Sequence, residues 1–300
     1  MPNEKSMDFV YEKYTNQILQ IIEEGKTLPW EKPWTSIWHK NISGREYKGI
    51  NPFMLDYAKE KNHFTSNIWI SLKQTLDMKR RIKKEEFNNS EWIVFWKFFK
   101  VKDKDNTDKT KTIPFIRYYK VYNFDQTEGI ELPKKFTEMH IINNHEEADK
   151  IVEGFKDKPP IYWDATDRAF YRISEDAIHV QNKDTFKTQE GYYATLFHEL
   201  IHSTGAKKRL NRDLDNWVST DMYKYNKEEL VAEFGSCFLM AKCQMNNENE
   251  FRKNADYIKG WSNAFKQDKK LLISAASKAQ KASDYILGIT YEQQQKQQEE

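Results

Sequence analysis

The sequence predicts an α+β protein, because segments with the pattern of β-strands alternate with segments with the pattern of helices. Residues 92–99 and 115–124 combine aromatic and β-branched side chains, which favours two antiparallel strands with the charged residues 102–111 as the loop between them. Shorter stretches of similar composition predict three small strands, at 159–163, 169–173 and 177–180. Apolar residues at helical spacing predict helices at 6–25, 53–61, 69–76, 145–156, 255–265 and 270–287.

Two domains are expected from the length of the chain and from the position of its turn-forming residues. A chain of 300 residues is long enough for two domains of ordinary size. Residues 125–133 have turn chemistry, so we place the first domain at 1–135 and the second at 136–290. The Gln-rich residues 291–300 are predicted to be a disordered tail.

The clearest chemical signal is residues 198–202, whose sequence HELIH has the H-E-x-x-H pattern. Residues four apart lie on one face of a helix, so His198 and His202 can bind a single metal ion. Glu199 lies about 100° round the same helix, where it can act as the general base on a metal-bound water. Gly205 stands where a left-handed cap would end the helix. The alternative is that two ordinary histidines fall at this spacing by chance.

A tetrahedral zinc site also needs a third protein ligand and an open position for water. The best candidates lie in the amphipathic segment 227–240, where Glu229 and Glu233 are one helical turn apart. An acid on a buried helix face is costly unless it is paired or binds a metal. We assign Glu229 as the third ligand and Glu233 as the acceptor for a histidine N–H, although the reverse assignment also fits the spacing. The alternative is two solvated glutamates near a helix start.

The second half has the layout of a zincin domain, in which a small twisted sheet packs on the active-site helix. His179 lies in the third predicted strand, where histidines are mostly structural, and we do not count it as a ligand. The polar residues 207–225 connect the two ligand helices and should border the cleft. Tyr223 or Tyr225 would be placed there to donate to the oxyanion of a tetrahedral intermediate, and we take Tyr225 as the candidate.

Composition and cysteine positions favour a soluble cytoplasmic protein without a membrane partner. No apolar run approaches the length that spans a bilayer, and the N-terminus lacks the apolar core of a signal peptide. Cys237 and Cys243 lie six residues apart on one predicted helix and therefore face different directions. We expect both to be reduced, buried thiols.

Basic and aromatic side chains are concentrated in the first half of the chain. Residues 1–135 have 25 Lys and Arg against 19 Asp and Glu, a net charge of +6, whereas the remainder carries −4. Six of the nine tryptophans precede residue 100, and the densest basic run is residues 79–84. Rings that stack on bases, beside cations that follow phosphates, suit single-stranded nucleic acid. The alternative is that the aromatics are core and the basic run is solvated surface.

Six segments of the chain carry a resemblance to a known family, in that family's order: 28–34, 47–51, 69–74, 121–127, 197–202 and 228–234. The chain resembles ArdC-type antirestriction proteins of conjugative plasmids and phages. These join an N-terminal single-stranded-DNA-binding domain to a zincin-like metallopeptidase domain. The Tyr47-x-Gly49-x-Asn51 and Asn123-x-x-Gln126 patterns are more discriminating than H-E-x-x-H, which many zincins share.

The resemblance implies that the first domain binds single-stranded DNA and that His198, His202 and Glu229 hold Zn²⁺ or another divalent metal. The candidates for DNA contact are aromatic and polar residues of the matched segments and cations around them: Trp34, Tyr47, Lys48, Asn51, Trp69, Lys73, Arg80, Arg81, Lys83 and Lys84. The expected function is protection of newly transferred DNA from host restriction, with a restriction enzyme or another protein as the peptidase substrate.

Two other functions fit the same residues. The protein would be a non-catalytic binding module if its metal were structural and Glu199 were held away from it. It would be a regulatory peptidase if the substrate were a repressor and DNA contact were incidental.

Overall fold

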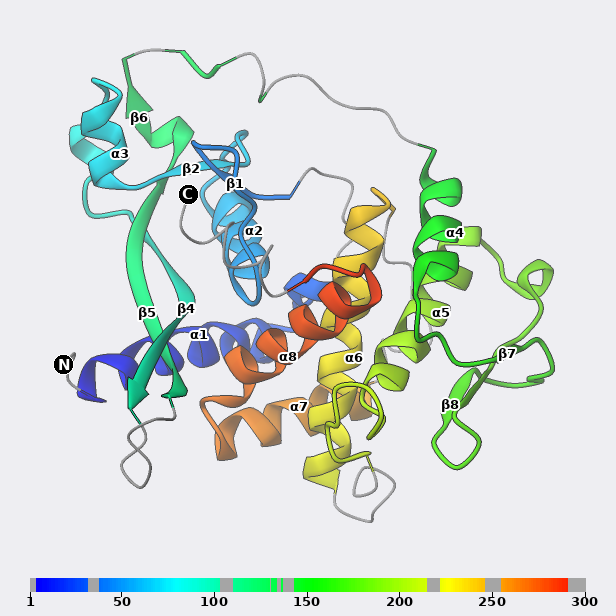
Figure 1. The fold of residues 1–300 in the computed structure, drawn as a ribbon. Coiled ribbons are helices and arrows are strands. Elements are labelled where there is room, and N and C mark those ends of the chain that lie inside the picture. Colours follow the sequence, from blue (N-terminus) through cyan, green and yellow to red (C-terminus); the bar gives the residue numbers. More distant parts are fainter. Residues whose placement is uncertain are drawn as a thin grey trace. The chain divides into compact units, whose positions relative to one another are not determined.

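The computed structural model contains helices and small sheets, which confirms the predicted α+β class (Figure 1). It describes residues 4–31, 38–102, 110–129, 131–133, 136, 143–214, 222–245 and 255–290. The chain divides into two compact units: unit 1 is Met1–Tyr14 with His39–Met139, and unit 2 is Thr15–Trp38 with His140–Glu300. The division after Met139 lies close to the boundary expected from the turn-forming residues, whereas Thr15–Trp38 belongs to unit 2. The predicted Gln-rich tail and most of the predicted hairpin loop lie outside the described residues.

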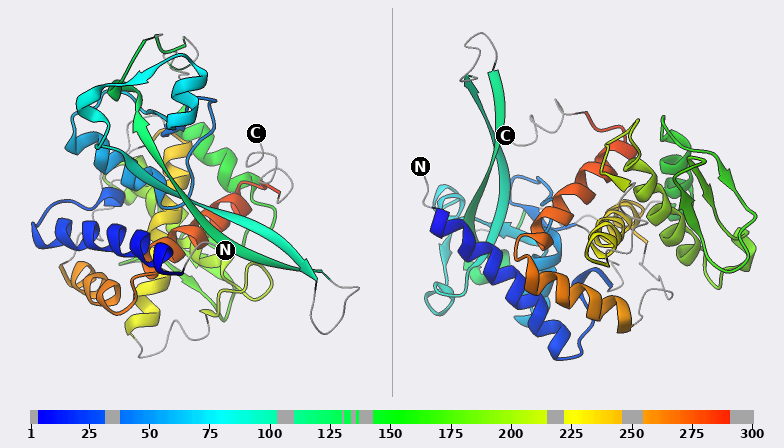
Figure 2. Two further views of the ribbon diagram at one scale, coloured as in Figure 1. Left: turned by 90° about the vertical axis from the view of Figure 1, so that its left-hand side faces the viewer. Right: turned by 90° about the horizontal axis from the view of Figure 1, so that it is seen from below.

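Unit 1 is built on a four-stranded sheet in the order β1-β2-β5-β4. Its strands are β1 (Lys40–Asn41), β2 (Ile68–Ile70), β5 (Thr110–Asn123) and β4 (Glu91–Lys102). The last two pair antiparallel along the whole of β4 and form a long twisted ribbon, which confirms the predicted strand pair (Figure 2). A two-stranded sheet joins β3 (Arg81–Ile82) to β6 (Thr127–Glu128).

The helices of unit 1 are α2 (Asn51–Lys61), α3 (Leu72–Asp77) and the first part of α1 (Glu4–Glu23). The prediction of one helix over 69–76 was wrong at its start, because Trp69 lies in β2. The helix begins only after Ser71, whose hydroxyl accepts a hydrogen bond from the Gln74 N–H while the Gln74 side chain accepts from the Ser71 N–H. This capping box fixes the start of the helix more strongly than the apolar pattern does.

Unit 2 places a small sheet against a group of helices. Its strands, in the order β7-β9-β8, are β7 (Ile161–Tyr162), β9 (Ala177–His179) and β8 (Phe170–Arg172). Its helices are α4 (Asn144–Gly154), α5 (Gln189–Thr204), α6 (Met222–Lys242), α7 (Ala255–Gln267) and α8 (Leu271–Ile286). The strands β8 and β9 pack on α5, which carries the H-E-x-x-H residues, as the sequence predicts. Short 3₁₀ turns lie at Pro29–Glu31, Lys84–Glu86, Phe124–Gln126 and Lys183–Thr185.

The two helices that carry the candidate ligands, α5 and α6, pack closely because small residues lie between them. A Cβ atom on Gly235 of α6 would lie 2.6 Å from Cδ1 of Ile201 on α5. One residue further along α6, the hydroxyl of Ser236 donates to the Ala194 carbonyl at 2.8 Å. Trp30 is completely buried and packs edge-on against Phe234 of α6, at 4.8 Å between ring centroids.

Gly205 does not have the left-handed conformation that we predicted at the end of α5, since its φ is −74°. It is needed for space instead, because a Cβ there would lie 2.9 Å from the side chain of Leu214. Cys237 and Cys243 are buried and form no disulfide, as predicted. None of the helices in the described part of the chain is long and apolar enough to cross a lipid bilayer.

Replacing Gly235 with alanine should destabilise the protein, because the added methyl group overlaps Ile201 in a fully packed interface. We expect a loss of about 1–3 kcal/mol in the free energy of unfolding, measured by denaturant titration of the full chain. The matched control is Gly154→Ala at the end of α4, where a Cβ meets nothing within 4 Å. Equal stability of the two variants would show that the α5–α6 interface accommodates the added methyl group.

Candidate metal centre

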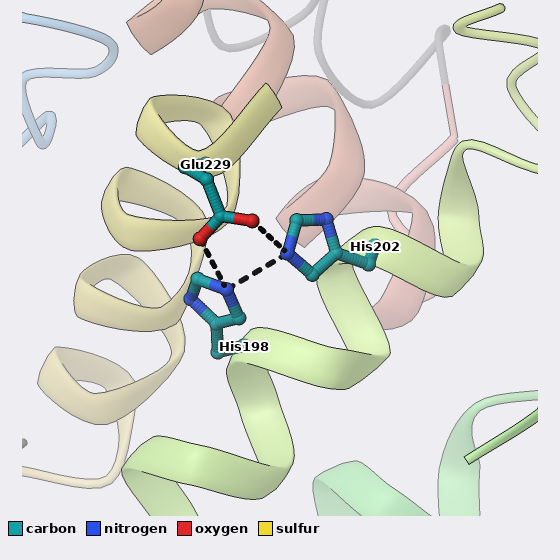
Figure 3. Close-up of side chains that lie close together, drawn as sticks. All are labelled: His198, His202 and Glu229. Atoms are coloured by element: carbon teal, nitrogen blue, oxygen red, sulfur yellow. Dashed lines mark hydrogen bonds and ion pairs between the residues drawn. The ribbon is translucent and has the colours of Figure 1, made fainter. Parts of the chain in front are cut away.

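The side chains of His198, His202 and Glu229 converge between α5 and α6 (Figure 3). One potential ligand atom from each lies within 4.8 Å of the other two. Nε2 of His198 is 2.8 Å from Nε2 of His202, and the two oxygens of Glu229 lie 3.6 Å and 3.5 Å from these nitrogens. All three residues are at least 95% buried. The spacing of four places both imidazoles on one helix face, as the sequence predicts.

The donor atoms of this cluster suit a small cation. Tetrahedral Zn²⁺ with bonds of roughly 2.0–2.1 Å has ligand atoms about 3.3 Å apart, close to the separations observed here. Two imidazole nitrogens 2.8 Å apart repel one another through their lone pairs unless the N–H proton of one ring or a metal ion lies between them. A cation at that point would also balance the facing carboxylate of Glu229. The donors and their arrangement therefore fit a divalent metal, while Glu233 lies on the far side of His198.

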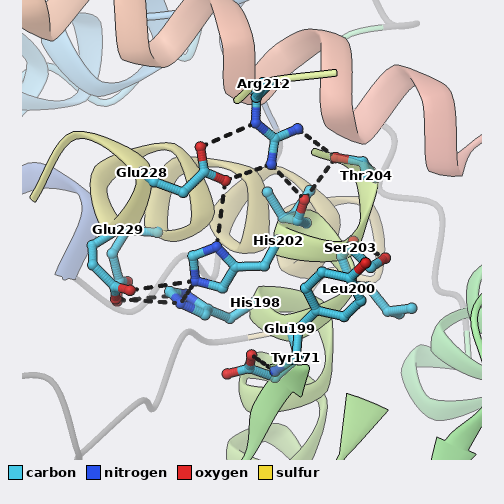
Figure 4. A network of polar contacts seen from close by, with 12 residues as sticks. Tyr171, His198, Glu199, Leu200, His202, Ser203, Thr204, Arg212, Glu228 and Glu229 are labelled. Atoms are coloured by element: carbon cyan, nitrogen blue, oxygen red, sulfur yellow. Dashed lines mark hydrogen bonds and ion pairs between the residues drawn. The ribbon is translucent and has the colours of Figure 1, made fainter. Parts of the chain in front are cut away.

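The outer nitrogen of each histidine faces a carboxylate on α6, and Figure 4 shows the one beside His202, Glu228. Oε1 of Glu228 lies 3.4 Å from Nδ1 of His202, and Oε1 of Glu233 lies 3.7 Å from Nδ1 of His198. We predicted Glu233 as the acceptor for a histidine N–H, but its 3.7 Å separation from Nδ1 of His198 is longer than a hydrogen bond, and we did not predict a role for Glu228. The role of Glu228 depends on a tertiary contact that the sequence does not show, because Nη2 of Arg212 donates to Glu228 at 2.6 Å. Such outer partners orient a ligand histidine and fix its tautomer.

Arg212 also ties this arrangement to the end of α5. It donates to the Ile201 carbonyl at 2.8 Å and to the Thr204 hydroxyl at 2.6 Å. A guanidinium at the C-terminal end of a helix satisfies carbonyl groups that have no partner within the helix. One side chain therefore holds the helix end and the carboxylate of Glu228 together.

Glu199, the predicted general base, points toward the neighbouring sheet. Its Oε2 accepts a hydrogen bond from the backbone N–H of Tyr171 in β8 at 2.8 Å. The Tyr171 hydroxyl donates to Asp176 at 2.6 Å, and Arg209 forms an ion pair with Asp176. Arg209 in turn donates to the Ser203 carbonyl at 3.1 Å. This chain of contacts fixes the edge of the sheet against the H-E-x-x-H helix, and no sequence pattern indicates it.

Burial and neighbouring charges set the protonation of the site. Burial raises the pKa of Glu199 to about 7, with His202 opposing the rise and Glu229 adding to it. Burial also raises the pKa of Glu233 well above its usual value, and repulsion from Glu229 adds to the effect. Burial lowers the pKa of His202, but Glu228 and Glu229 outweigh it and raise the pKa to about 10. The cluster thus attracts positive charge, whether as protons or as a metal ion.

Two other candidates from the second half have different positions from those expected. Tyr223 and Tyr225 lie within the first turns of α6, not in the connection that precedes it. The Tyr223 hydroxyl donates to Asp268 at 3.0 Å, so it is used within the fold. His179 lies in β9 with its two ring nitrogens beside Asp164 and Glu175, which agrees with the structural role expected for it.

Several residues predicted to contact DNA are instead buried in unit 1. Tyr47, Asn51, Trp69 and Arg80 are all at least 92% buried. The Asn51 amide accepts from the backbone N–H of Val94 at 2.8 Å and donates to its carbonyl at 2.6 Å, so it completes the pairing of edge strand β4. These side chains support the fold, and direct contact with DNA would require them to leave the core.

Trp69 and Arg80 are each held by a specific partner. The indole N–H of Trp69 donates to Nδ1 of His39 at 2.9 Å. The guanidinium of Arg80 donates to the Thr127 hydroxyl at 2.9 Å and lies 4.0 Å from the ring centre of Phe124. The sequence alone does not distinguish such buried, hydrogen-bonded side chains from side chains on the surface.

The remaining DNA candidates are at least partly accessible. Lys73, Arg81 and Lys84 are exposed, although Arg81 forms an ion pair with Glu128. Lys48 is partly exposed, and so is Lys83, which donates to the Asp125 carbonyl at 2.7 Å. Trp34 lies outside the described residues.

The structure adds an exposed aromatic and basic pair that the sequence did not single out. Phe95 of β4 and Arg117 of β5 are directly opposite each other in the strand register, and both are exposed. The ring of Phe95 meets that of Tyr119 edge-on at 5.6 Å. The strand register that creates this pair could be inferred only once the pairing of β4 with β5 was known.

Comparison with known proteins finds a family match in each half of the chain. Residues 146–278 match the family described as zincin-like metallopeptidase, and residues 8–122 match the N-terminal domain of anti-restriction factor ArdC. Unit 2 thus has the zincin-like fold. The ArdC protein from plasmid R388 is similar over 97% of its own chain and 93% of this one, at 30% identity and a TM-score of 0.72 in its metal-free crystal structure. The chain belongs to the ArdC antirestriction family, which confirms the resemblance seen in the sequence.

A second structure and two curated proteins are also similar over most of this chain. The Mn(II)-bound crystal structure of the same R388 protein is 31% identical to this chain, with a TM-score of 0.74 over 93% of it. An uncharacterized protein y4eC of Sinorhizobium fredii is 28% identical over 92% of this chain and 91% of its own length. DNA primase TraC of Escherichia coli is 29% identical over 96% of this chain, which spans only 28% of TraC.

Glu229→Gln removes the carboxylate that faces both Nε2 atoms, so it should weaken zinc binding more than any outer change. Loss of an outer partner typically lowers metal affinity by roughly 10–100-fold, and we expect a larger loss for Glu229→Gln. Glu233→Gln, one turn further along α6, is the matched comparison and should stay within that range. Both affinities are measured on the full chain by competition with a fluorescent zinc chelator. A larger loss for Glu233→Gln would reverse the two assignments.

Proposed function

We propose that unit 2 is a metal-dependent peptidase in which His198, His202 and Glu229 hold a divalent ion, with Zn²⁺ the expected metal. The observation that carries this proposal is the buried cluster of two imidazoles and one carboxylate, with an acid, Glu199, on the adjacent position of the same helix. The cluster has three members among the described residues, which leaves a position for water. The zincin-like fold and the Mn(II)-bound relative support a divalent metal.

The chemistry assigned to this chain's own residues is proton transfer and orientation. A metal bound there would polarise a peptide carbonyl and lower the pKa of a bound water. Glu199 would take the proton of that water and deliver it to the leaving amine, which suits an acid whose pKa burial raises to about 7. The Tyr171 N–H keeps one oxygen of Glu199 in place, and Glu228 with Arg212 keeps the ring of His202 in place. Tyr225 stays a candidate oxyanion donor.

We infer that unit 1 binds single-stranded DNA along exposed aromatic and basic side chains. The accessible cations Lys48, Lys73, Arg81, Lys83 and Lys84 would follow the phosphates. Exposed bases would stack on Phe95, beside Arg117 on the adjacent strand. The net charge of +6 on residues 1–135 and the match to the ArdC N-terminal domain support this role.

Together the two activities fit a cytoplasmic protein that shields entering DNA of a plasmid or phage from host restriction. Binding to single strands would place the protein on DNA at the time of transfer. The peptidase substrate would then be a restriction enzyme or another protein that acts on the same DNA. Family membership supports the antirestriction role, and the site supports the peptidase.

Glu199→Gln should abolish proteolysis while leaving metal binding intact, because it removes the general base and none of the proposed ligands. We expect peptide hydrolysis to fall by roughly 10²–10⁴-fold. The measurement is cleavage of a quenched fluorescent peptide library by the zinc-loaded full chain, with metal content determined in parallel. Glu190→Gln, on the same helix and beside His145, is the control and should cleave normally. Equal cleavage by the Glu199 variant would refute the assignment, and a loaded wild type that cleaves no peptide would favour the non-catalytic module.

The double variant Phe95→Ala, Arg117→Ala should weaken binding of the full chain to fluorescent oligo(dT). Loss of one base stack costs about 1–3 kcal/mol, so we expect roughly a 10-fold drop or more in affinity. The dependence of log affinity on log salt should also become shallower by about 0.7, because one phosphate contact is lost. Tyr162→Ala removes an exposed aromatic of unit 2 and serves as the control. Unchanged binding by the double variant would place the DNA elsewhere.

A further inference from the structure

An open pocket of about 1000 Å³ lies along β8, the edge strand of the sheet in unit 2. It is lined by residues 166–168 and 170–174, which form the loop before the strand, the strand itself and the turn after it. Tyr171 is one of the lining residues, and its backbone N–H is the group that binds Glu199. The pocket therefore adjoins the proposed general base.

The strand geometry determines which way the backbone of Tyr171 faces. Tyr171 pairs with Ile178 in the central strand β9, and the N–H of Ile178 donates to Pro160 on the opposite side, toward β7. In an antiparallel pair, opposite residues either exchange hydrogen bonds with each other or both point away. The polar backbone groups of Tyr171 thus point away from β9, toward the open edge of β8. An extended peptide can pair with such an edge, here through the Tyr171 carbonyl, since the Tyr171 N–H already donates to Glu199.

The two arginines of the pocket differ in what holds them. Arg172 forms an ion pair with Glu175 at 2.7 Å, and its guanidinium lies 4.9 Å from the ring centre of Phe170. Arg168 is exposed, and within the described part of the chain it forms no ion pair. Arg168 and Asp167 both line this pocket, which adjoins Glu199 through the backbone N–H of Tyr171.

We propose that Arg168 binds a carboxylate of the peptide substrate, so that the site prefers peptides with an acidic side chain next to the bond presented to Glu199. This proposal rests on the peptidase function and names its substrate class. A planar guanidinium matches a carboxylate through two parallel hydrogen bonds. A nucleic-acid phosphate is less well suited, because residues 136–300 carry a net charge of −4 and the strand edge offers peptide groups.

Binding of defined peptides tests the proposal without requiring cleavage. The zinc-loaded full chain with Glu199→Gln is titrated against two fluorescein-labelled, alanine-based decapeptides, one with a central Glu-Glu pair and one with a central Lys-Lys pair. We expect the acidic peptide to bind roughly 10-fold tighter or more, since hydrogen bonds between charged groups are strong. Adding Arg168→Glu should remove or reverse this preference. The matched control is Lys156→Glu, an exposed charge reversal in unit 2 outside the pocket lining, which should leave the preference unchanged.

Three results would overturn the role of Arg168. The first is that the Glu199→Gln protein shows no preference for the acidic peptide, and the second is that the preference is unchanged after Arg168→Glu. The third is that Arg168→Glu weakens binding of oligo(dT) and leaves peptide binding unchanged. The peptidase function is tested separately, by cleavage of the acidic peptide by the chain with Glu199 intact. A protein that binds the acidic peptide through Arg168 and never cuts it would refute the peptidase function while leaving the binding role in place.

Discussion

Four glutamates, Glu199, Glu228, Glu229 and Glu233, are buried beside two histidines between α5 and α6. Isolated buried carboxylates are costly, and each must take up a proton, face a cation or bind a metal. Burial opposes ionisation of Glu228, but Arg212 and His202 outweigh it and lower its pKa. Glu199, Glu229 and Glu233 are also buried, and a positive charge between the two Nε2 atoms would stabilise their ionised forms. A divalent ion at that point would satisfy the whole cluster with a single charge centre.

The rest of unit 2 holds this cluster in place. Gly235 lets α6 approach α5, which sets the distance between Glu229 and the histidines. At the end of α5, Arg212 fixes Glu228, while Arg209 and Asp176 fix the sheet edge that contacts Glu199. Buried charged side chains keep a fixed geometry when each contacts a partner on a helix or strand. The same contacts place an open strand edge and its pocket beside the general base.

The sequence predicted best what depends on local spacing. The positions of His198 and His202 on one helix face follow from a spacing of four, and an acid on an otherwise apolar helix pointed to Glu229. The pairing of Glu228 with Arg212 and the contact of Glu199 with a strand backbone arise from tertiary packing, which no single-chain pattern encodes. In unit 1, Asn51 and Arg80 form hydrogen bonds with buried backbone groups. We predicted them to contact DNA because Asn and Arg are also common at DNA-binding surfaces. Gly205 was expected to provide a backbone conformation and instead provides space.

The metal site is tested by the metal content of the purified full chain after dialysis against a small excess of Zn²⁺ or Mn²⁺, determined by elemental mass spectrometry. We expect one divalent ion per chain, and its loss when His198 and His202 are both replaced by alanine. A chain that retains no ion under either condition would contradict this expectation, because the buried carboxylates would then have to be balanced by protons alone.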